Sequence, residues 1–392
     1  MGWDSNPRRA RTLAGFQDRC LQPLGHPSIK TCLRCYKTFT AGQEILLYPP
    51  LKYAINLYQR RGISHMKKNY KTTTLLTLFF FFFGLWPDGQ SAPAAEFSDW
   101  LNKEFKPIAR QGGITPATLN RAFKDAKYIP QAVTCDGTQA EFKQTFIQYK
   151  EKRIPPRIST ARKKGKKHRR LLDTIQSKYG VSKEIILSLW GLESNFGTYT
   201  GNFVVVNTLA TLAFEGRRRD FFTKELLEAL KILQESQMDV KKLKGSWAGA
   251  LGQCQFMPSA FNLHAVDTSN KGFKDIWNSK SDVFSSIANY LINSGWHTKE
   301  PWGVEVSLPK GFNKKLATLK KKHPKRYWVK LGLRAKKKDG MIPDLTGSLI
   351  IPDDKDQAFI VYNNFRVILK WNRSICFALT VCLFADQLRS HR

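Results

Sequence analysis

The sequence has few acidic residues, and this shortage is its most pronounced compositional feature. Its 392 residues include 31 Asp or Glu against 64 Lys or Arg, so the formal net charge at pH 7 is +33. Such an imbalance favours an anionic partner, for example a nucleic acid, a membrane surface or an acidic polymer. The net charge alone does not distinguish among these three classes of partner. We interpret the basic runs 162–170 and 336–338 as solvated surface.

Cysteines are also few and widely spread, which excludes a dense disulfide framework. The chain has seven of them. Cys32 and Cys35 form a single CxxC without a second pair at zinc-finger spacing, so the pattern gives little support to a metal site. The sequence allows a disulfide bridge among Cys135, Cys254, Cys376 and Cys382 but does not assign one. There is no zinc-finger or basic-zipper pattern, which argues against a nucleic-acid binder.

The apolar run at 75–85 is too short to span a bilayer, which takes about 20 residues. It follows Met66 and three lysines, and the small residues of 90–95 come after it. This order is typical of a secretory signal peptide. We therefore predict a signal peptide over 66–95, cleavage near Ala94 or Ala95, and a periplasmic protein. A lipid anchor is not indicated, because no Cys lies beside the cleavage site.

Residues 1–65 precede this signal and show little periodicity. A signal peptide works poorly behind a long polar extension. We interpret Met66 as the true start and residues 1–65 as a mis-assigned extension, with a genuine extra domain as the alternative. Abundant peptides from residues 1–65 in mass spectra of the natural protein would contradict this interpretation.

The remainder of the chain predicts a mainly helical fold. Residues 96–180 and 181–300 carry apolar residues at helical spacing. Val304–Leu308 alternates between apolar and polar side chains and predicts a strand within a small mixed insertion over 303–352. From residue 355 the pattern is again helical and apolar. We find no internal repeat and no heptad run.

One glutamate lies on the apolar face of a predicted helix. In the segment 181–197, Ile186, Leu189 and Trp190 are followed at i+7 by Glu193. Gly180 can end the preceding helix and Ser182 can cap this one, while Asn195 and Gly197 indicate that it ends just past Glu193. Burial raises the pKa of a carboxyl group, as a general acid requires. A structural hydrogen bond or salt bridge is the alternative role.

Five segments then occur in order and together resemble one family. They are LWGLESNFG (189–197), NTLATLAF (207–214), RRRDFFTKEL (217–226), KGSWAGALGQCQFMP (244–258) and NYLINSGW (289–296). They are similar to the lytic murein transglycosylases of the membrane-bound type B-like branch, and residues 365–387 resemble the end of the same domain. The likeness covers 96–388. It implies a lysozyme-like helical core, with a helical N-terminal part and the small mixed insertion.

The resemblance maps the family's single catalytic glutamate onto Glu193. It implies that this residue first protonates the oxygen leaving C1 of N-acetylmuramic acid. Glu193 would then take the proton of that sugar's 6-hydroxyl, which closes onto C1 and gives a 1,6-anhydro end without water. Glycosidases usually need two carboxylates. We see no second acid paired with Glu193, and interpret the nearby glutamates as surface partners of basic residues; they are Glu215, Glu225 and Glu228.

The resemblance also implies substrate-binding residues, each with a plainer alternative. They are Ser246, Gln255, Tyr290, Asn372, Arg217 and Arg218. Ser246 and Gln255 would hydrogen-bond sugar and hold the glutamate, in a segment whose glycines would let a glycan approach the backbone. The alternatives are a tight packing turn for that segment, a core aromatic for Tyr290 and solvated surface for the two arginines. Trp371, beside Asn372, stands where a Tyr is common in the family.

We expect no cofactor and no metal. Residues 267–272 resemble the start of a calcium loop of some relatives, but the fifth position is Lys271 and the twelfth is Asn278, which do not suit calcium. The expected partners are peptidoglycan glycan strands and proteins of wall synthesis, with no nucleic acid, and the protein is expected to be a monomer. A lysozyme-like hydrolase and a non-catalytic glycan-binding protein are the competing functions.

Overall fold

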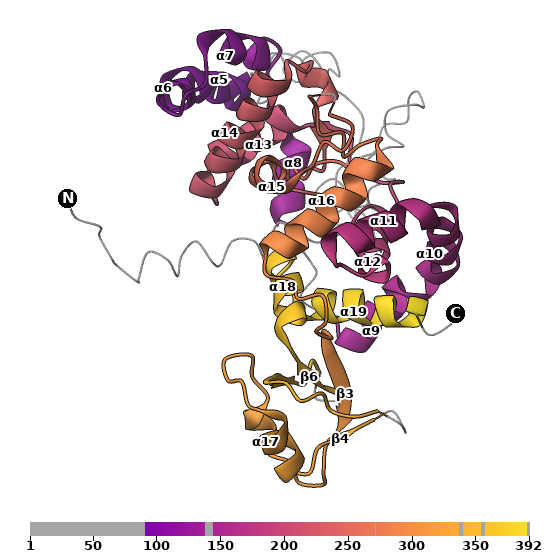
Figure 1. Cartoon of the computed structure of the whole chain (residues 1–392). Coiled ribbons are helices and arrows are strands. Elements are labelled where there is room, and N and C mark those ends of the chain that lie inside the picture. Colours follow the sequence, from indigo (N-terminus) through magenta and orange to yellow (C-terminus); the bar gives the residue numbers. More distant parts are fainter. Residues whose placement is uncertain (1–90, 138–143, 271, 337–339, 354–356, 390–392) are drawn as a thin grey trace, which may run out of the picture. The chain divides into compact units, whose positions relative to one another are not determined.

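The computed structural model describes residues 91–137, 144–270, 272–336, 340–353 and 357–389 (Figure 1). Residues 1–90, which hold the predicted extension and most of the predicted signal peptide, lie outside the described residues. Helices dominate the described part and strands are few and short. The prediction of a mainly helical fold with a small mixed insertion is therefore confirmed.

The first helices pack around an aromatic cluster. They are α5 (Ser91–Trp100), the π-helix η2 (Leu101–Phe105), α6 (Lys106–Gln111), α7 (Pro116–Phe123), α8 (Pro130–Gly137) and α9 (Phe146–Arg153). Thr115 caps α7, where its side chain accepts a hydrogen bond from the Thr118 backbone N–H. Phe97 and Trp100 each place a ring 5.7 Å from that of Phe214 in α13. These contacts fix the N-terminal helices against the central ones.

The central helices include α12, which carries Glu193. They are α10 (Pro155–Lys167), α11 (Arg169–Tyr179), α12 (Lys183–Ser194), α13 (Val205–Phe214), α14 (Arg219–Ser236), α15 (Pro258–His264) and α16 (Lys280–Asn293). Helix α12 packs against α10, α11, α16 and the last helix, α19. Because neighbours cover it on several sides, it is buried nearly throughout. The predicted apolar face is present, but the helix has no broad wet face opposite it.

Two small antiparallel sheets interrupt the helices. The first pairs β1 (Phe203–Val204) with β2 (Lys244–Gly245). The second has the order β4-β3-β6-β5, with β3 (Gly303–Ser307), β4 (Arg334–Ala335), β5 (Ser348–Ile350) and β6 (Ala358–Val361). It also carries the short helices η5 (Lys314–Leu316) and α17 (Lys325–Lys330). We call residues 303–361 the sheet subdomain.

The sheet subdomain has a hydrophobic core of its own. Val306, Trp328 and Ile360 are among the buried side chains of a cluster separate from the main core. Strand β6 lies at the centre of the sheet, with Val304 opposite Ile360. The prediction of helix from residue 355 is wrong at 358–361, because these apolar residues are buried between two paired strands and not on a helix face.

The chain ends in α18 (Asn363–Trp371) and α19 (Ile375–Arg389). Among the described helices, none is long and apolar enough by itself to cross a membrane; α18 and α19 together satisfy length and composition but bend by 119°. Trp302, just before β3, donates a hydrogen bond from Nε1 to Asp386 of α19 at 2.9 Å. Asp353 accepts backbone N–H groups from Phe146 and Ile147 at the start of α9.

Candidate active site

Helix α12 places Glu193 in its last turn. Gly180 ends α11 in the left-handed conformation with φ 67°, as predicted, and Asn195 ends α12 in the same conformation with φ 49°. Ser182 holds the N-cap position, but its side chain makes no capping hydrogen bond. Gly191 lets α12 lie against Phe196, since a Cβ there would meet the Phe196 ring at 2.7 Å. The predicted end of the helix beyond Glu193 is confirmed.

The Glu193 carboxyl group is buried and has one donor directed at it. Its side chain is 3% exposed. Trp371 donates a hydrogen bond from Nε1 to Glu193 Oε1 at 2.7 Å. Burial raises the pKa of Glu193 from 4.5 to about 8, and the bond from Trp371 acts in the opposite direction. The carboxyl group is thus protonated at neutral pH and able to act as a general acid, as the helical position predicted.

Trp371 is held by other aromatic side chains. Its ring centroid lies 4.7 Å from that of Tyr290 and 5.2 Å from that of Phe256. The Tyr290 hydroxyl donates to the Lys370 carbonyl at 2.8 Å, so it fixes the residue before Trp371. The sequence analysis counted Tyr290 and Asn372 among the site residues, but it noted Trp371 only as standing where a Tyr is common in the family. Its role could have been predicted from its position beside Asn372 and from the indole N–H, which can donate a hydrogen bond to a carboxyl group.

Asn372 is fully buried at the bend between α18 and α19. Its backbone N–H donates to the Ile368 carbonyl at 3.0 Å, and its side-chain oxygen accepts from the Ser374 backbone N–H at 2.9 Å. These bonds close α18 and set the direction of the turn. Asn372 therefore helps to present Trp371 toward Glu193.

The loop between β2 and α15 carries Ser246 and Gln255. Ser246 Oγ accepts a hydrogen bond from the Ala250 backbone N–H at 3.0 Å. Gln255, in the left-handed region with φ 50°, donates from Nε2 to the carbonyls of Gly252 at 2.8 Å and Thr200 at 3.2 Å. Both side chains are buried and bonded within the protein. They stabilise the shape of this loop.

Gln253 joins the same loop to α12 and was not predicted. Its Oε1 accepts a hydrogen bond from Trp190 Nε1 at 2.8 Å, and both groups are buried. Its Nε2 donates to the Trp277 carbonyl. Trp190 lies one helical turn before Glu193, so this bond fixes the part of α12 that carries the carboxyl group.

The glycines of this loop approach protein and not open space. A Cβ at Gly245 would lie 2.3 Å from the Ala250 carbonyl oxygen, one at Gly249 would lie 2.5 Å from the Leu209 side chain, and one at Gly252 would lie 2.7 Å from Ile276. These contacts support the alternative of a tight packing turn, and approach of a glycan to this backbone stays a prediction.

Arg217 and Arg218 both contact Asp136 at the end of α8. Arg217 donates from Nε to Asp136 Oδ2 at 2.6 Å and is about half exposed, with 49% of its side chain accessible. Arg218 is buried and pairs with the other carboxylate oxygen. The two arginines therefore do not pair with Glu215, Glu225 or Glu228. Whether they also contact substrate stays a prediction.

The comparisons with known proteins identify the family of the chain. The model of the family described as "Transglycosylase SLT domain" matches residues 96–386. The chain belongs to the transglycosylase SLT domain family. It is 38% identical over 143 residues to the membrane-bound lytic murein transglycosylase B of Escherichia coli strain K12. That match covers 35% of this chain and 39% of the relative, so it spans well under half of the curated protein.

Solved structures match more of the SLT domain. SltB3 from Pseudomonas aeruginosa, in complex with NAG-anhNAM-pentapeptide, has a TM-score of 0.71 and 40% identity, covering 75% of this chain and 79% of that one. The soluble lytic transglycosylase SltB1 from Pseudomonas aeruginosa has a TM-score of 0.64 and 30% identity, covering 76% and 98%. Escherichia coli SLT35 in complex with calcium has a TM-score of 0.62 and 26% identity, covering 76% and 92%.

The loop singled out above for its likeness to a calcium site is held by hydrogen bonds of its own. Asp267 accepts backbone N–H groups from Ser269 at 3.0 Å and from Gly272 at 2.8 Å, so its carboxylate is already engaged within the loop. Asn278 donates its N–H to Asp275 at 2.9 Å. Lys271 itself lies outside the described residues. Across the described residues, no group of three or more His, Cys, Asp or Glu could hold a metal ion.

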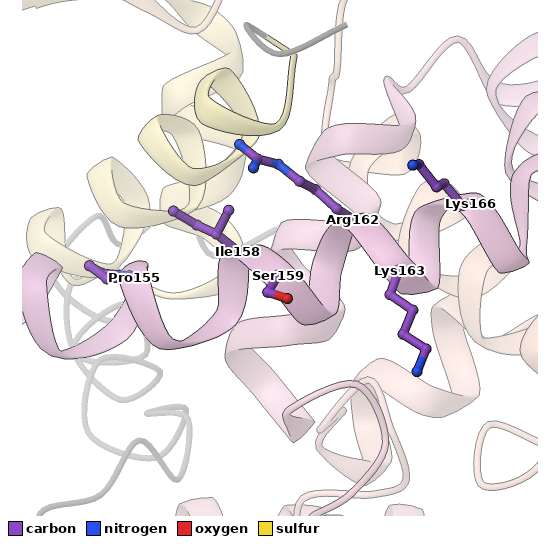
Figure 2. A pocket seen from close by; sticks show the side chains of 6 residues that line it. All are labelled: Pro155, Ile158, Ser159, Arg162, Lys163 and Lys166. Carbon is purple, nitrogen blue, oxygen red and sulfur yellow. The ribbon is translucent and has the colours of Figure 1, made fainter.

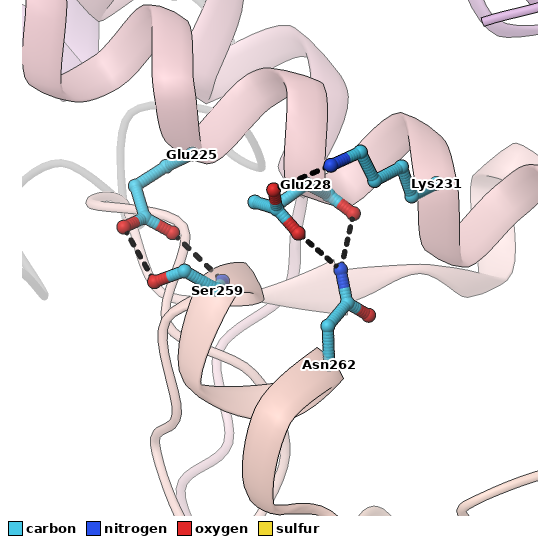
Figure 3. A network of polar contacts seen from close by, with 5 residues as sticks. All are labelled: Glu225, Glu228, Lys231, Ser259 and Asn262. Carbon is cyan, nitrogen blue, oxygen red and sulfur yellow. Dashed lines mark hydrogen bonds and ion pairs between the residues drawn. The ribbon is translucent and has the colours of Figure 1, made fainter. Parts of the chain in front are cut away.

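Two other glutamates of the SLT domain join helices. Glu225 is buried and accepts hydrogen bonds from the Ser259 backbone N–H at 2.9 Å and hydroxyl at 2.7 Å (Figure 3). Glu228 accepts from Asn262 at 2.7 Å and from Lys231 at 2.8 Å. The interpretation as surface partners of basic residues is therefore wrong for Glu225, which is buried. Glu228 does pair with a basic residue, Lys231, but not with the arginines 217–219. Both carboxylates fasten α14 to α15, and neither shifts the pKa of Glu193.

A shallow depression of about 530 Å³ lies along α10, away from the residues just described (Figure 2). Its lining residues are Pro155, Ile158, Ser159, Arg162, Lys163 and Lys166. None of them was predicted to act in catalysis, and the basic run 162–170 supplies half of them. The depression is a basic surface feature and not the candidate active site.

Proposed function

We propose that the protein is a lytic transglycosylase that cleaves the β-1,4 bond between MurNAc and GlcNAc of peptidoglycan and leaves a 1,6-anhydro-MurNAc end. The observation that carries the proposal is the buried, protonated Glu193 with Trp371 bonded to it. Membership of the SLT family over residues 96–386 supports it. So does the relative SltB3, whose structure holds NAG-anhNAM-pentapeptide.

Glu193 acts first as an acid. Its pKa of about 8 keeps the proton on the carboxyl group at neutral pH. The proton passes to the glycosidic oxygen as the bond from C1 of MurNAc to that oxygen breaks. Negative charge then develops on Glu193, and the Trp371 N–H stabilises it because a hydrogen bond to the charged form favours that form. Burial keeps the carboxyl group of Glu193 protonated before the reaction, and the hydrogen bond from Trp371 lowers the free-energy cost of releasing the proton.

Glu193 acts next as a base. The carboxylate takes the proton of the 6-hydroxyl of the same MurNAc, while O6 forms a bond to C1. The carboxyl group is thereby restored to its protonated form and no water is consumed. Burial of Glu193 to 3% exposure favours this route over hydrolysis, because little solvent reaches the carboxylate. Burial and Trp371 account for the pKa shift, and no second carboxyl group takes part.

The flanking residues are proposed to support this chemistry. Tyr290 and Asn372 hold Trp371 in place, and Ser246 and Gln255 shape the loop beside α12. Arg217 is half exposed and can offer remaining N–H groups to substrate carboxylates. Direct contact of Ser246, Gln255, Tyr290, Asn372, Arg217 or Arg218 with the glycan stays a prediction.

The partner and location follow from the same proposal. Peptidoglycan glycan strands are the proposed substrate, and the periplasm is the proposed compartment. The family match begins at residue 96, directly after the predicted cleavage site, which supports a signal peptide over 66–95 and a catalytic domain over 96–388. The predicted monomer and contacts with wall-synthesis proteins stay predictions.

The test is the identity of the product. Purified peptidoglycan is digested with the protein, and the released muropeptides are separated and weighed. We expect 1,6-anhydro ends, which are lighter than reducing ends by one water. Reducing-end MurNAc would replace the proposal with a lysozyme-like hydrolase. Binding of glycan without any cleavage would replace it with a non-catalytic glycan-binding protein.

A further inference from the structure

The sheet subdomain carries an excess of positive charge, with fourteen Lys or Arg against six Asp or Glu over 303–361. Its segment 303–336 contains eleven Lys or Arg and a single acidic residue, Glu305. That carboxylate is already paired with Lys336, with Nζ to Oε1 at 2.8 Å. Eleven basic residues and one acid give this segment a formal net charge of +10. Like charges gathered in this way repel one another and create a positive potential over the surface.

The cations are exposed and are carried on a rigid base. Lys314 and Lys315 lie in η5, Lys320 to Lys322 follow it, and Arg326 is in α17, all of them exposed. Beneath them Trp328 and Leu349 belong to the core of the subdomain. The four strands fix the segments that bear the cations. The charge is thus presented on a folded surface.

Two apolar side chains protrude from the same subdomain. Met341 is 82% exposed and Val329 is 39% exposed. Their sequence neighbours Ile342 and Trp328 belong to one core cluster, which anchors both segments. Exposed large apolar side chains are few in the described residues, and the others are Ile108, Tyr199 and Leu263. Lysines together with protruding aliphatic groups are the combination that binds anionic lipid surfaces.

The basic depression on α10 differs in this respect. Arg162, Lys163 and Lys166 are exposed there. However, none of the exposed large apolar side chains of the described residues lines it, and Ile158 is half-buried and packs against the main core (Figure 2). This second basic surface therefore offers charge without an apolar anchor, and it provides a matched control.

We propose that the sheet subdomain is a docking surface for anionic phospholipid headgroups, with its lysines above the phosphates and Met341 and Val329 at the acyl boundary. The lysine stems can lie along the surface while their ammonium groups reach the phosphates. Docking needs neither Glu193 nor peptidoglycan, so the proposal stands apart from the proposed catalytic function.

The test measures sedimentation of the full chain with phosphatidylglycerol vesicles and with neutral phosphatidylcholine vesicles. All variants keep the same N-terminal segment, so that a difference arises in the subdomain. The triple variant Lys320→Glu, Lys321→Glu, Lys322→Glu is compared with Arg162→Glu, Lys163→Glu, Lys166→Glu, which changes the net charge equally. Each cation near an anionic surface contributes roughly fivefold, so the first variant should bind phosphatidylglycerol at least ~100-fold more weakly. The second should retain most of the binding.

A further variant tests the apolar anchor. Met341→Ser removes an exposed side chain and should not unfold the protein, which circular dichroism checks. It should weaken binding at least ~fourfold, the effect of one buried methylene. Equal loss in both charge variants would overturn the proposal, since net charge would then suffice. Unchanged vesicle binding in the first variant, with weaker binding to purified peptidoglycan sacculi, would assign the surface to the wall instead. An inactive Glu193→Gln protein should still bind vesicles.

Discussion

The helices around Glu193 and the sheet subdomain place their charge in opposite ways. The first region buries Glu193 at 3% exposure, which raises the pKa of its carboxyl group to about 8. The second exposes most of its eleven basic residues and holds one acid within 303–336. Burial makes a single group chemically reactive, because the charged form loses its solvation. Exposed cations keep their hydration, and their summed positive charge acts over a distance that becomes shorter as the salt concentration rises.

The largest effect is expected for a substitution that removes catalysis by the helical region and leaves the proposed binding by the sheet subdomain unchanged. Glu193→Gln keeps the shape of the side chain and removes the proton donor, so turnover of peptidoglycan should fall by ~10²–10⁴. Vesicle binding should not change. Glu225→Gln is the matched control, because it alters another buried glutamate that Trp371 does not contact. If a Glu225→Gln protein with an unchanged melting temperature lost as much activity, Glu193 would not be the single acid.

The pH dependence of activity and of stability should arise from Glu193 in the helical region. Activity should fall about tenfold per pH unit above pH 8, as Glu193 loses its proton. The folded pKa lies above the unfolded value of 4.5, so the stability that this group contributes is fully present below pH 4.5 and is lost as the pH rises to about 8. Within that window the loss is about 1.4 kcal/mol per pH unit. Denaturant titrations of Glu193→Gln should lack this slope; an identical slope would place the titrating group elsewhere.

A smaller effect is expected for Trp371→Phe. The ring is kept, but the donor to Glu193 is lost, so turnover should fall ~10-fold or more, as for hydrogen bonds to charged groups. The pKa of Glu193 should rise further, because that bond lowers it, and the high-pH limb of activity should move upward. Trp302→Phe, which loses a similar bond to Asp386, is the control. A shift of the limb in both variants would indicate a general structural effect.

The smallest effect is expected for Tyr290→Phe. It removes the hydroxyl that donates to the Lys370 carbonyl and keeps the ring against Trp371. The free energy of unfolding should fall by about 1 kcal/mol, measured with urea, and activity should fall only a few-fold. A loss of activity as large as that of Glu193→Gln would show that the hydroxyl acts on substrate and not on the position of Trp371.

The sequence predicted the elements that depend on neighbours along the chain. The end of α12, the left-handed Gly180 and the apolar position of Glu193 all follow from helical spacing and capping preferences. The family resemblance rested on ordered segments and needed no geometry. The N-cap at Ser182 was correct in position but not in its hydrogen bond, which depends on rotamer and packing.

Contacts between distant segments could not be predicted in this way. Trp371 lies 178 residues from Glu193, and Gln253 lies 63 residues from its partner Trp190. Asp136 appeared in no motif, although it holds both arginines. Strand β6 has an apolar pattern that fits a helix equally well, and only its pairing with β3 and β5 decides its form.

By itself, the sequence determined that Glu193 would be buried on a helix, that the fold would be mainly helical and that the basic residues would far outnumber the acidic ones. Helix formation and the apolar position of Glu193 depend on residues nearby in the sequence, and the excess of basic residues is a sum over the chain. Both can therefore be obtained from the sequence alone. The tertiary structure alone decided which group meets the carboxyl group of Glu193 and which of the basic residues are exposed. Those outcomes depend on which distant segments pack together, because a hydrogen bond or an ion pair acts over a few ångströms and not along the sequence.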